Sequence, residues 1–411
     1  MKIVKRTICA AAIAVFISSP ALAQQAGDYR SAASGNWGDA STWETFDGTN
    51  WVAAVNAPAG SETITVRGDD TVRVDIAVSV AGYVKVEETG IVEISSGSLA
   101  FDNGSTYEHA RDGGSIPVAT WGQGSTALLT GTIQDAPANR NQSFYNFTFN
   151  TPNLGRNRDM GWNDIVIGGV VRVINTGAFR WQLTSIAAND TAAFAIMGDV
   201  IVEDGQFAVQ GTSNAQTTFI VHHYGNLNVT GGNFSLARGS QGNGSGTTTW
   251  YLHQGNFSMD SAATQNSNPT PGNAKFVLAK NDTQQVAFKN VTYAGGRIHF
   301  EVADSSTMAI IGPFVVNGNL VNRGAVVPQD TLTFTNGAVY EHARNGGSVP
   351  LAVWQEGSAA LFTGITSTAP ENRGQDYYHL TLNTPGLTSN RDLALDGNTI
   401  SGNLTVISTG S

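Results

Sequence analysis

Two stretches of the sequence gather the types of side chain that bind sugars. The stretch from Tyr107 to Trp121 returns at Tyr340 to Trp354, an offset of 233 residues, with 11 of 15 positions identical. Aromatic faces stack on sugar rings, Arg and His donate hydrogen bonds to hydroxyl groups, and two weak copies gain avidity. One hypothesis is therefore a repeated glycan-binding patch formed by Tyr107, His109, Arg111, Trp121, Tyr340, His342, Arg344 and Trp354.

A structural interpretation of the same stretch competes with this hypothesis. Gly113-Gly114 would form a corner, Pro117 would end a strand ladder, and Trp121 would fill the core. Glu108 and Arg111 would then pair, or bond to exposed backbone at a break between coils. The whole block recurs, glycines and proline included, whereas a binding patch would need only the side chains. The recurrence of backbone-shaping residues therefore favours the structural interpretation.

Carboxylates in the repeated region could support catalysis. Polysaccharide lyases and hydrolases need an acid/base pair or a metal-activated proton acceptor in a groove. The best candidates are Glu108 with Asp159, and Glu341 with Asp392, which occupy equivalent positions in the two copies. A catalytic centre has no need to be duplicated, whereas a structural corner or a multivalent face does. The sequence therefore predicts no catalytic residues, and a polysaccharide-degrading enzyme is the alternative.

Metal-ligating residues are sparse. Among the seven histidines, His222-His223 is the most suggestive pair, but neighbouring residues on a strand point to opposite faces. The stretches Gly68 to Asp70 and Asn281 to Thr283 could bind calcium, yet neither forms a full oxygen-ligand loop. Both are more typical of polar turns. We predict no metal site and no cofactor, with calcium the one possible ion.

The elements that must position these residues are strands. Between residues 64 and 101, pairs of apolar residues separated by one other residue recur. The first, second and third pairs are each followed by a similar pair 20, 20 and 21 residues later. Alternation with period two indicates strands with one buried face. A constant return after every third strand predicts a three-faced coil, stacked into an all-β, elongated parallel β-helix or solenoid. Strands that begin at Gly198-Asp199, Gly225-Asn226 and Gly255-Asn256 lie 27 and 30 residues apart, which predicts wider coils. The chain would form on the order of 15 coils, at about 4.8 Å per coil.

The chain divides into four predicted parts. Residues 1–23 carry a basic start, an apolar run and a small-residue cleavage site, which is typical of a signal peptide. Residues 24–60 are rich in turn formers and contain Trp37, Trp43 and Trp51, which would cap the solenoid. Residues 61–330 form a first solenoid unit. Residues 331–411 form a second, apparently incomplete unit, since many more residues follow the recurring block in the first unit than in the second.

Composition limits the partners. Removal of the signal would leave 19 basic and 32 acidic residues, so no nucleic acid partner is expected. The only cysteine, Cys9, lies in the signal, so an exported form would have no disulfides and would depend on packing. No later apolar run is long enough to span a membrane.

The sequence also resembles a known class of proteins. Ser34 to Trp43, Phe46 to Trp51 and the Val-rich strands resemble the opening of large exported β-solenoid surface proteins of bacteria that use type IX secretion. Tyr107 to Trp121 and Gly255-Asn256-Phe257-Ser258 resemble their repeat units, and residues 34–101 are similar to the all-β extracellular domain named for its eight glycines. The resemblance implies a parallel β-helix at or outside the cell surface, with an adhesive or matrix role.

These observations predict an exported, non-catalytic structural or adhesive surface protein. Its partner would be a cell-surface or environmental polysaccharide. The alternative is a β-helix protein that binds or degrades polysaccharide.

Overall fold

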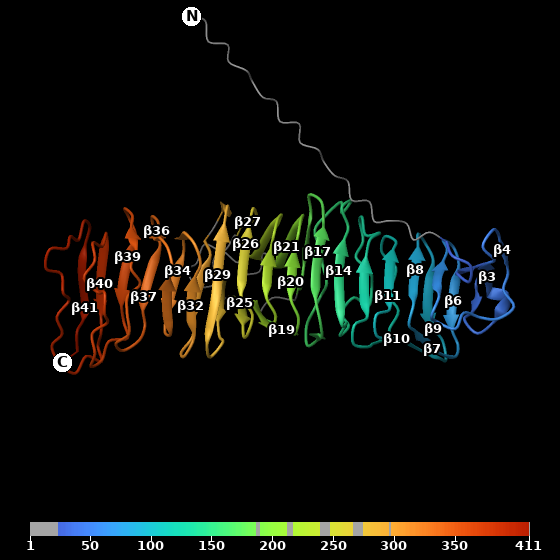
Figure 1. Cartoon of the computed structure of the whole chain (residues 1–411), viewed down its shortest axis with the longest axis horizontal. Helices are drawn as coiled ribbons and strands as arrows, with labels where there is room; N and C mark the ends of the chain where they lie inside the picture. The colour runs from blue at the N-terminus through green and yellow to red at the C-terminus, as the bar shows by residue number, and fades with distance from the viewer. Residues whose placement is uncertain are drawn as a thin grey trace, which may run out of the picture.

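The computed structural model describes residues 24–185, 190–211, 217–238, 247–265, 274–295 and 297–410, so the predicted signal at 1–23 lies outside the described residues. Strands stack along one axis from the N-terminal cap to the C-terminal coil (Figure 1). The chain forms a parallel β-solenoid of about 13 turns, which confirms the predicted fold class. The sequence predicts on the order of 15 turns, and the turns in the middle of the rod take 27 to 30 residues, which are the wider coils that the Gly-Asn spacing predicts. Within the described residues, no helix is long and apolar enough to cross a bilayer.

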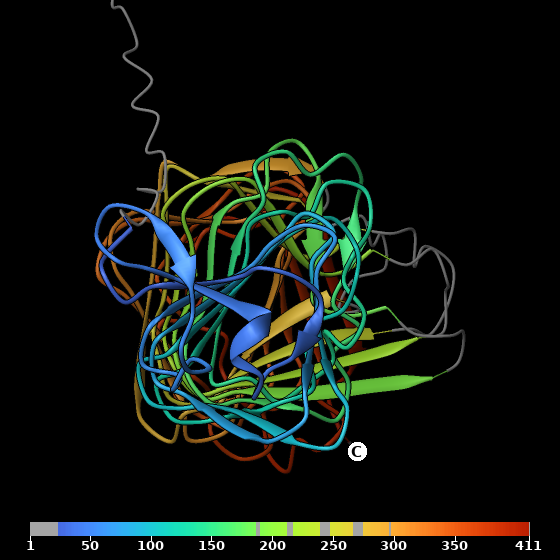
Figure 2. The same ribbon diagram turned by 90° about the vertical axis from the view of Figure 1, so that its right-hand side faces the viewer.

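Each turn of the chain visits three faces in the same order, and the winding is visible along the axis (Figure 2). The first face is a 15-stranded sheet. Its strands are β1 (Tyr29–Ser31), β3 (Trp43–Phe46), β4 (Trp51–Ala53), β5 (Thr63–Val66), β8 (Tyr83–Glu87), β11 (Thr106–Ala110), β13 (Thr126–Leu129), β14 (Asn146–Asn150), β17 (Val171–Asn175), β20 (Val200–Val202), β23 (Leu227–Val229), β26 (Phe257–Asp260), β29 (Thr283–Lys289), β32 (Thr307–Ile310) and β35 (Ala325–Pro328).

The second face consists of three shorter sheets that follow one another along the rod. Its strands are β2 (Gly35–Asn36), β6 (Thr71–Val74), β9 (Ile91–Ile94), β15 (Arg158–Asp159), β18 (Arg180–Gln182), β21 (Gln206–Gln210), β24 (Asn233–Ala237), β27 (Ala263–Gln265), β30 (Thr292–Gly295), β33 (Phe314–Val316), β36 (Leu332–Phe334) and β38 (Val353–Trp354).

The third face consists of a three-stranded sheet and an 11-stranded sheet. Its strands are β7 (Ala77–Val80), β10 (Ser98–Phe101), β12 (Thr120–Trp121), β16 (Val166–Ile167), β19 (Thr191–Ile196), β22 (Thr218–His223), β25 (Thr247–Leu252), β28 (Ala274–Leu278), β31 (His299–Val302), β34 (Asn319–Asn322), β37 (Val339–His342), β39 (Ala359–Phe362), β40 (His379–Asn383) and β41 (Leu404–Ser408).

The alternating apolar residues form the core. In β5, Ile64 and Val66 are fully buried, and in register beside them lie Val84 and Val86 of β8, which are also buried. Side chains between them, such as Thr65, point outward. Each coil therefore places its apolar residues directly above those of the previous coil, and burial of these rows supplies most of the stabilisation.

The N-terminal cap is built around two tryptophans. Trp37 and Trp43 are buried and pack edge to face, with ring centroids 5.3 Å apart. The short 3-10 helix η1 (Ala40–Thr42) leads directly into the strand that begins at Trp43. Strands β1, β3 and β4 form an antiparallel meander, while β1 also pairs in parallel with β5 of the first regular coil. The cap thus pairs with the start of the solenoid, and its two buried tryptophans pack into the apolar end of the core.

The two copies of the recurring block lie on different faces of one continuous stack. In the first copy, β11 and β13 belong to the first face, whereas their equivalents β37 and β39 belong to the third face. The chain between the copies does not complete a whole number of turns, so the second copy is displaced by one face. Their outward surfaces consequently point in different directions.

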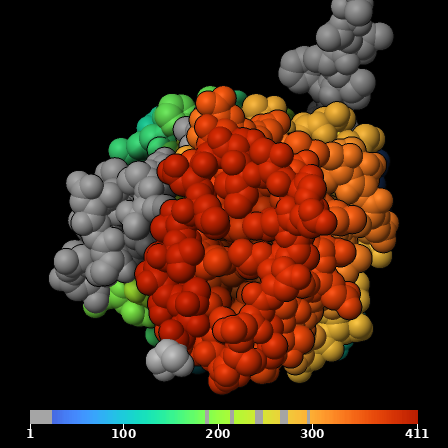
Figure 3. Space-filling model, turned by 90° about the vertical axis from the view of Figure 1, so that its left-hand side faces the viewer, coloured from blue at the N-terminus to red at the C-terminus, as the bar shows by residue number. Residues whose placement is uncertain are grey.

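Figure 3 shows the C-terminal end of the rod, where the last coil faces the viewer. Strand β41 pairs with β40 on one side only, with Leu404 beside Leu380 and Val406 beside Leu382. Leu404 and Val406 remain 52% and 57% exposed although their positions face the core. An apolar row of the solenoid therefore ends here without a strand beyond it in the described residues.

Candidate functional site

The Tyr and His of the recurring block lie inside the core. Tyr107 and His109 are buried, and the Tyr107 hydroxyl lies 2.9 Å from Nδ1 of His109. Nε2 of His109 lies 2.7 Å from the carbonyl oxygen of Gly113. Because a carbonyl oxygen only accepts, Nε2 carries the proton and Nδ1 accepts from the Tyr hydroxyl. Burial lowers the pKa of His109 to about 4, so the ring is neutral at neutral pH.

The second copy repeats this arrangement. The Tyr340 hydroxyl lies 3.0 Å from Nδ1 of His342, and Nε2 of His342 lies 2.8 Å from the carbonyl oxygen of Gly346. Tyr340 and His342 are also buried. Of the eight residues in the glycan-patch hypothesis, these four therefore offer no ring face to solvent.

Arg111 and Trp121 are partly exposed but are engaged within the coil. The Arg111 guanidinium donates to the carbonyl oxygens of Thr89, at 3.1 Å, and Gly90. Gly114 leaves the space for this side chain, since a Cβ there would lie 2.5 Å from Cζ of Arg111. Its φ of +67° is also a conformation that favours glycine. The backbone conformation therefore favours glycine at this position, and its lack of a Cβ leaves room for the Arg111 guanidinium.

Trp121 packs against the previous coil. Its ring stacks on Phe101 with centroids 4.6 Å apart, and its Nε1 lies 3.3 Å from Oε1 of Gln142. Trp354 stacks on Phe334 at 4.5 Å in the same way. The Arg344 side chain lies against Gly347, as Arg111 lies against Gly114. The two tryptophans thus tie neighbouring coils together through the same contacts.

One of the four differences between the copies has a clear physical reason. Oδ1 of Asp112 accepts hydrogen bonds of 2.8–2.9 Å from three successive backbone N–H groups, those of residues 133, 134 and 135. Oδ1 of Asn345 accepts 2.9–3.0 Å bonds from the N–H groups of residues 366, 367 and 368. Only one oxygen is used in each case, so Asp and Asn can fill the same position.

The carboxylates proposed as an acid/base pair are not brought together. Glu108 lies on β11 of the first face, whereas Asp159 lies on β15 of the second face and pairs with Arg140 at 3.2 Å. In the second copy, Glu341 lies on β37 of the third face, and Asp392 lies outside the strands. Neither pair flanks a common groove.

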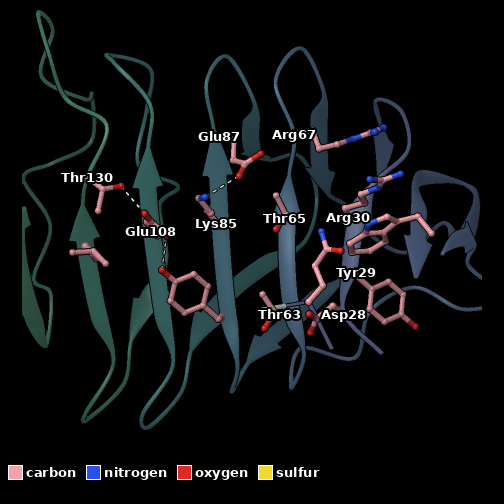
Figure 4. A pocket seen from close by; sticks show the side chains of 14 residues that line it. Asp28, Tyr29, Arg30, Thr63, Thr65, Arg67, Lys85, Glu87, Glu108 and Thr130 are labelled. Atoms are coloured by element: carbon pink, nitrogen blue, oxygen red, sulfur yellow. Dashed lines mark hydrogen bonds and ion pairs between the residues drawn. The ribbon is translucent and has the colours of Figure 1, made fainter. Parts of the chain in front are cut away.

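A trough lined by polar and charged side chains lies on the outer surface of the first face. It encloses about 510 Å³ and spans the junction between the cap and the first coils. Thr63 and Thr65 of β5 form its floor, because their side chains point outward between the buried residues of that strand. Figure 4 shows both threonines between Arg30 on one side and Lys85 on the other. We call this cavity the β5 trough.

The walls of the β5 trough combine aromatic and charged side chains. On the cap side, the Arg30 guanidinium lies 4.5 Å from the ring centre of Trp51. On the other side, Tyr83 and Lys85 project from β8. Lys85 pairs with Glu87 at 2.8 Å. The cations of both walls are therefore already partnered.

Glu108 fixes the outer wall. Its Oε2 accepts a 2.5 Å hydrogen bond from the Tyr83 hydroxyl, and its Oε1 accepts a 2.6 Å bond from the Thr130 hydroxyl. Burial, and after it the bond to Glu108, raises the pKa of Tyr83 well above its ordinary value. Tyr83 is therefore protonated throughout the physiological range and is held in place across the sheet.

Glu108 can be selected from the sequence, but the trough around it cannot. The alternation between residues 63 and 86 shows that Thr63, Thr65, Tyr83 and Lys85 point outward. It does not show that the cap returns to lie beside them, because that depends on the pairing of Arg30 with Thr65 across 35 residues. The sequence pattern that could have indicated the trough is the outward-facing Tyr83 on the strand next to Thr63 and Thr65.

The remaining candidate residues have structural partners. His223 is buried and its neighbour His222 points outward, as expected for adjacent strand residues. Nδ1 of His222 lies 2.9 Å from Nε2 of His253 on the next coil. In the part of the chain that the structure describes, no group of three or more His, Cys, Asp or Glu residues is placed to hold a metal ion.

The two stretches considered for calcium are turns whose side chains are engaged. Oδ1 of Asp69 accepts a 2.6 Å hydrogen bond from the Thr89 hydroxyl, and Oδ2 of Asp70 accepts one of the same length from Ser31. In the other stretch, Asp282 pairs with Lys280 at 3.4 Å. These carboxylates therefore contact neighbouring protein groups.

Comparison with models of known protein families, with curated proteins and with solved structures finds no match.

Proposed function

We propose that this protein is an exported structural or adhesive surface protein that acts as a stiff β-solenoid rod without catalytic activity. The observation that carries this proposal is the recurring block. Its most distinctive side chains make the same internal contacts in both copies, with Tyr107 and His109 buried in one and Tyr340 and His342 buried in the other. Repetition of a coil-joining block is expected of a protein that is selected for its length and shape.

Export is supported by residues 1–23, which have the order of charge, apolar run and small residues that a signal peptide needs. A solenoid without cysteines suits this destination, since its stability comes from stacked coils and does not depend on oxidation. The proposal can be tested by expressing the full chain in a bacterium and determining the intact mass of the protein outside the cytoplasm. We expect a mature chain that begins at Gln24. Retention of residues 1–23 in a cytoplasmic protein would contradict export.

The absence of catalysis is supported by the separation of the paired carboxylates, because an acid/base mechanism needs both groups at one substrate. Purified protein without residues 1–23 should release neither reducing ends nor unsaturated sugars from a panel of polysaccharides. Reproducible release that is lost in Glu108→Gln or Asp159→Asn would overturn this part of the proposal.

A further inference from the structure

We propose that the β5 trough is a binding site for an uncharged oligosaccharide built of pyranose rings. The inference goes beyond the structural role of the rod and does not rest on it. It also differs from the glycan patch considered from the sequence, since it uses none of the residues buried in the recurring block.

The shape of the trough suits an extended, narrow ligand. Its lining reaches across five neighbouring strands of the first face, from β1 through β5, β8 and β11 to β13. Neighbouring strands are about 4.8 Å apart, so the trough extends roughly 19 Å across the sheet, which suits a chain of several sugar rings laid across the strands. The volume of about 510 Å³ lies within the range of small-molecule sites.

Tyr83 provides a fixed aromatic surface. Its side chain starts on β8, and its hydroxyl is bound to Glu108 of β11, so the ring lies across the neighbouring coil. A ring fixed in this way loses little conformational entropy when a ligand stacks on it. The apolar face of a pyranose is the type of surface that packs on an aromatic ring whose hydroxyl remains hydrogen-bonded.

The charge of the lining favours a neutral ligand. The trough is lined by three acidic and three basic side chains, namely Asp28, Glu87, Glu108, Arg30, Arg67 and Lys85. The basic groups have ion-pair partners, with Arg30 2.7 Å from Glu44 and Lys85 2.8 Å from Glu87. A balanced and paired lining attracts neither polyanions nor polycations over a distance. It still presents alternating donors and acceptors, together with the floor hydroxyls, to the hydroxyl groups of a sugar.

The repeat supplies an internal comparison. Glu341 is equivalent to Glu108 and accepts a 2.8 Å hydrogen bond from Thr363, as Glu108 does from Thr130. The strand beside Glu341, however, carries Asn319 and Val321 where the strand beside Glu108 carries Tyr83 and Lys85. The Glu–Thr pair therefore belongs to the repeated coil, whereas the aromatic wall and the trough belong to the first copy alone.

The test is isothermal titration calorimetry of the purified protein without residues 1–23. The probes are cellotetraose, laminaritetraose, mannotetraose and maltotetraose, with tetragalacturonate as the anionic comparison. We expect at least one neutral tetrasaccharide to bind and tetragalacturonate to bind more weakly. Failure of all four neutral probes to bind, or tighter binding of the anion, would overturn the proposal.

Two variants locate the site. Tyr83→Ala removes the stacking surface and should weaken binding by about tenfold. Thr65→Tyr fills the trough from an outward position and should abolish binding while leaving the core and the melting temperature unchanged. Asn319→Ala, at the position of the second copy that corresponds to Tyr83, is the matched control and should bind as the unchanged protein does. If Thr65→Tyr melts normally and still binds with full affinity, the ligand is bound elsewhere and the proposal is wrong.

Discussion

At the scale of single residues, the recurring block acts through hydrogen bonds that leave few groups free. In the first copy, the Tyr107 hydroxyl donates to His109, and His109 donates to the Gly113 carbonyl. A sugar hydroxyl could reach these groups only by opening the core and breaking one of the bonds. Such a buried chain of polar groups is stable when every member is paired and costly when one is removed. This explains why Tyr, His and Gly recur together.

The hydrogen bonds of Asp112 give a testable prediction, because the second copy carries Asn345 at the equivalent position. Asp112→Asn should change the free energy of unfolding by less than about 0.5 kcal/mol, because Asn345 makes the same three bonds with one oxygen. Asp112→Ala removes the acceptor from three N–H groups and should cost about 1–2 kcal/mol. Urea unfolding measures the free energy of unfolding of both variants. The corresponding pair in the second copy, Asn345→Asp and Asn345→Ala, is the control. Equal destabilisation by the Asn and Ala variants of Asp112 would contradict the role assigned to Oδ1.

The buried histidines predict a dependence of stability on pH. Burial lowers the pKa values of His109, His223 and His299 to about 4, whereas an unfolded His has a pKa of about 6.5. The unfolded chain therefore binds more protons between these values. Stability should be constant above about pH 6.5 and should fall as the pH decreases toward about 4, by up to about 3 kcal/mol for each histidine.

Thermal unfolding between pH 7.5 and pH 4.5 measures this effect. His109→Gln should lower the melting temperature at pH 7.5, because it breaks the internal hydrogen bonds, but should make the fall with decreasing pH shallower. His379→Gln is the control, because His379 is partly exposed on β40. A melting temperature that does not change over this range would show that the buried rings are not kept neutral by the fold.

At the scale of elements, the coil could be predicted from the sequence, but its junctions could not. Ile64 pairs with Val84, Val72 with Val92 and Val78 with Leu99, which are the partners that the returns of 20 and 21 residues indicate. Alternation and spacing are local patterns, so they can be recognised directly in the sequence. The displacement of the second copy by one face depends on the summed lengths of many corners, and no local pattern records that sum. The trough depends on β1 lying beside β5, a contact between the cap and the first coil.

The repeat also allows two equivalent strands to be compared. Val171 of β17 is fully buried, because β20 covers it, whereas its equivalent Leu404 of β41 is 52% exposed. Val171→Ala should cost about 2 kcal/mol from lost burial and the cavity left behind. Leu404→Ala should cost less than about 1 kcal/mol. Chemical unfolding of the two variants measures the difference. Equal losses would contradict the account, because they would show that the C-terminal coil is covered in solution.

At the scale of the whole molecule, the protein is a rod whose two block copies face different directions. Nine strand-to-strand steps lead along the first face from β11 of the first copy to β35. From β35 the chain passes around the same coil to β37, where the second copy begins. At about 4.8 Å per step, the steps along the first face cover more than 40 Å. Two patches so far apart and turned by one face would not meet a flat surface together. The geometry therefore gives the repeat a role in extending the rod, while the β5 trough gives one end a distinct surface.

The central claim is that the recurring block joins coils, and thermal unfolding of Trp121→Ala and Trp354→Ala tests it most directly. Each variant should lower the melting temperature clearly. The loss of stability should be smaller than the roughly 3–5 kcal/mol that truncation of a fully buried Trp costs, because both rings are packed on a neighbouring coil but partly exposed. Val118→Ala and Leu351→Ala are matched controls at equivalent, 60% and 62% exposed positions of the two copies and should leave melting nearly unchanged. If both Trp variants melt like the unchanged protein but lose binding on a glycan array, the block is a ligand-binding surface and the account is contradicted.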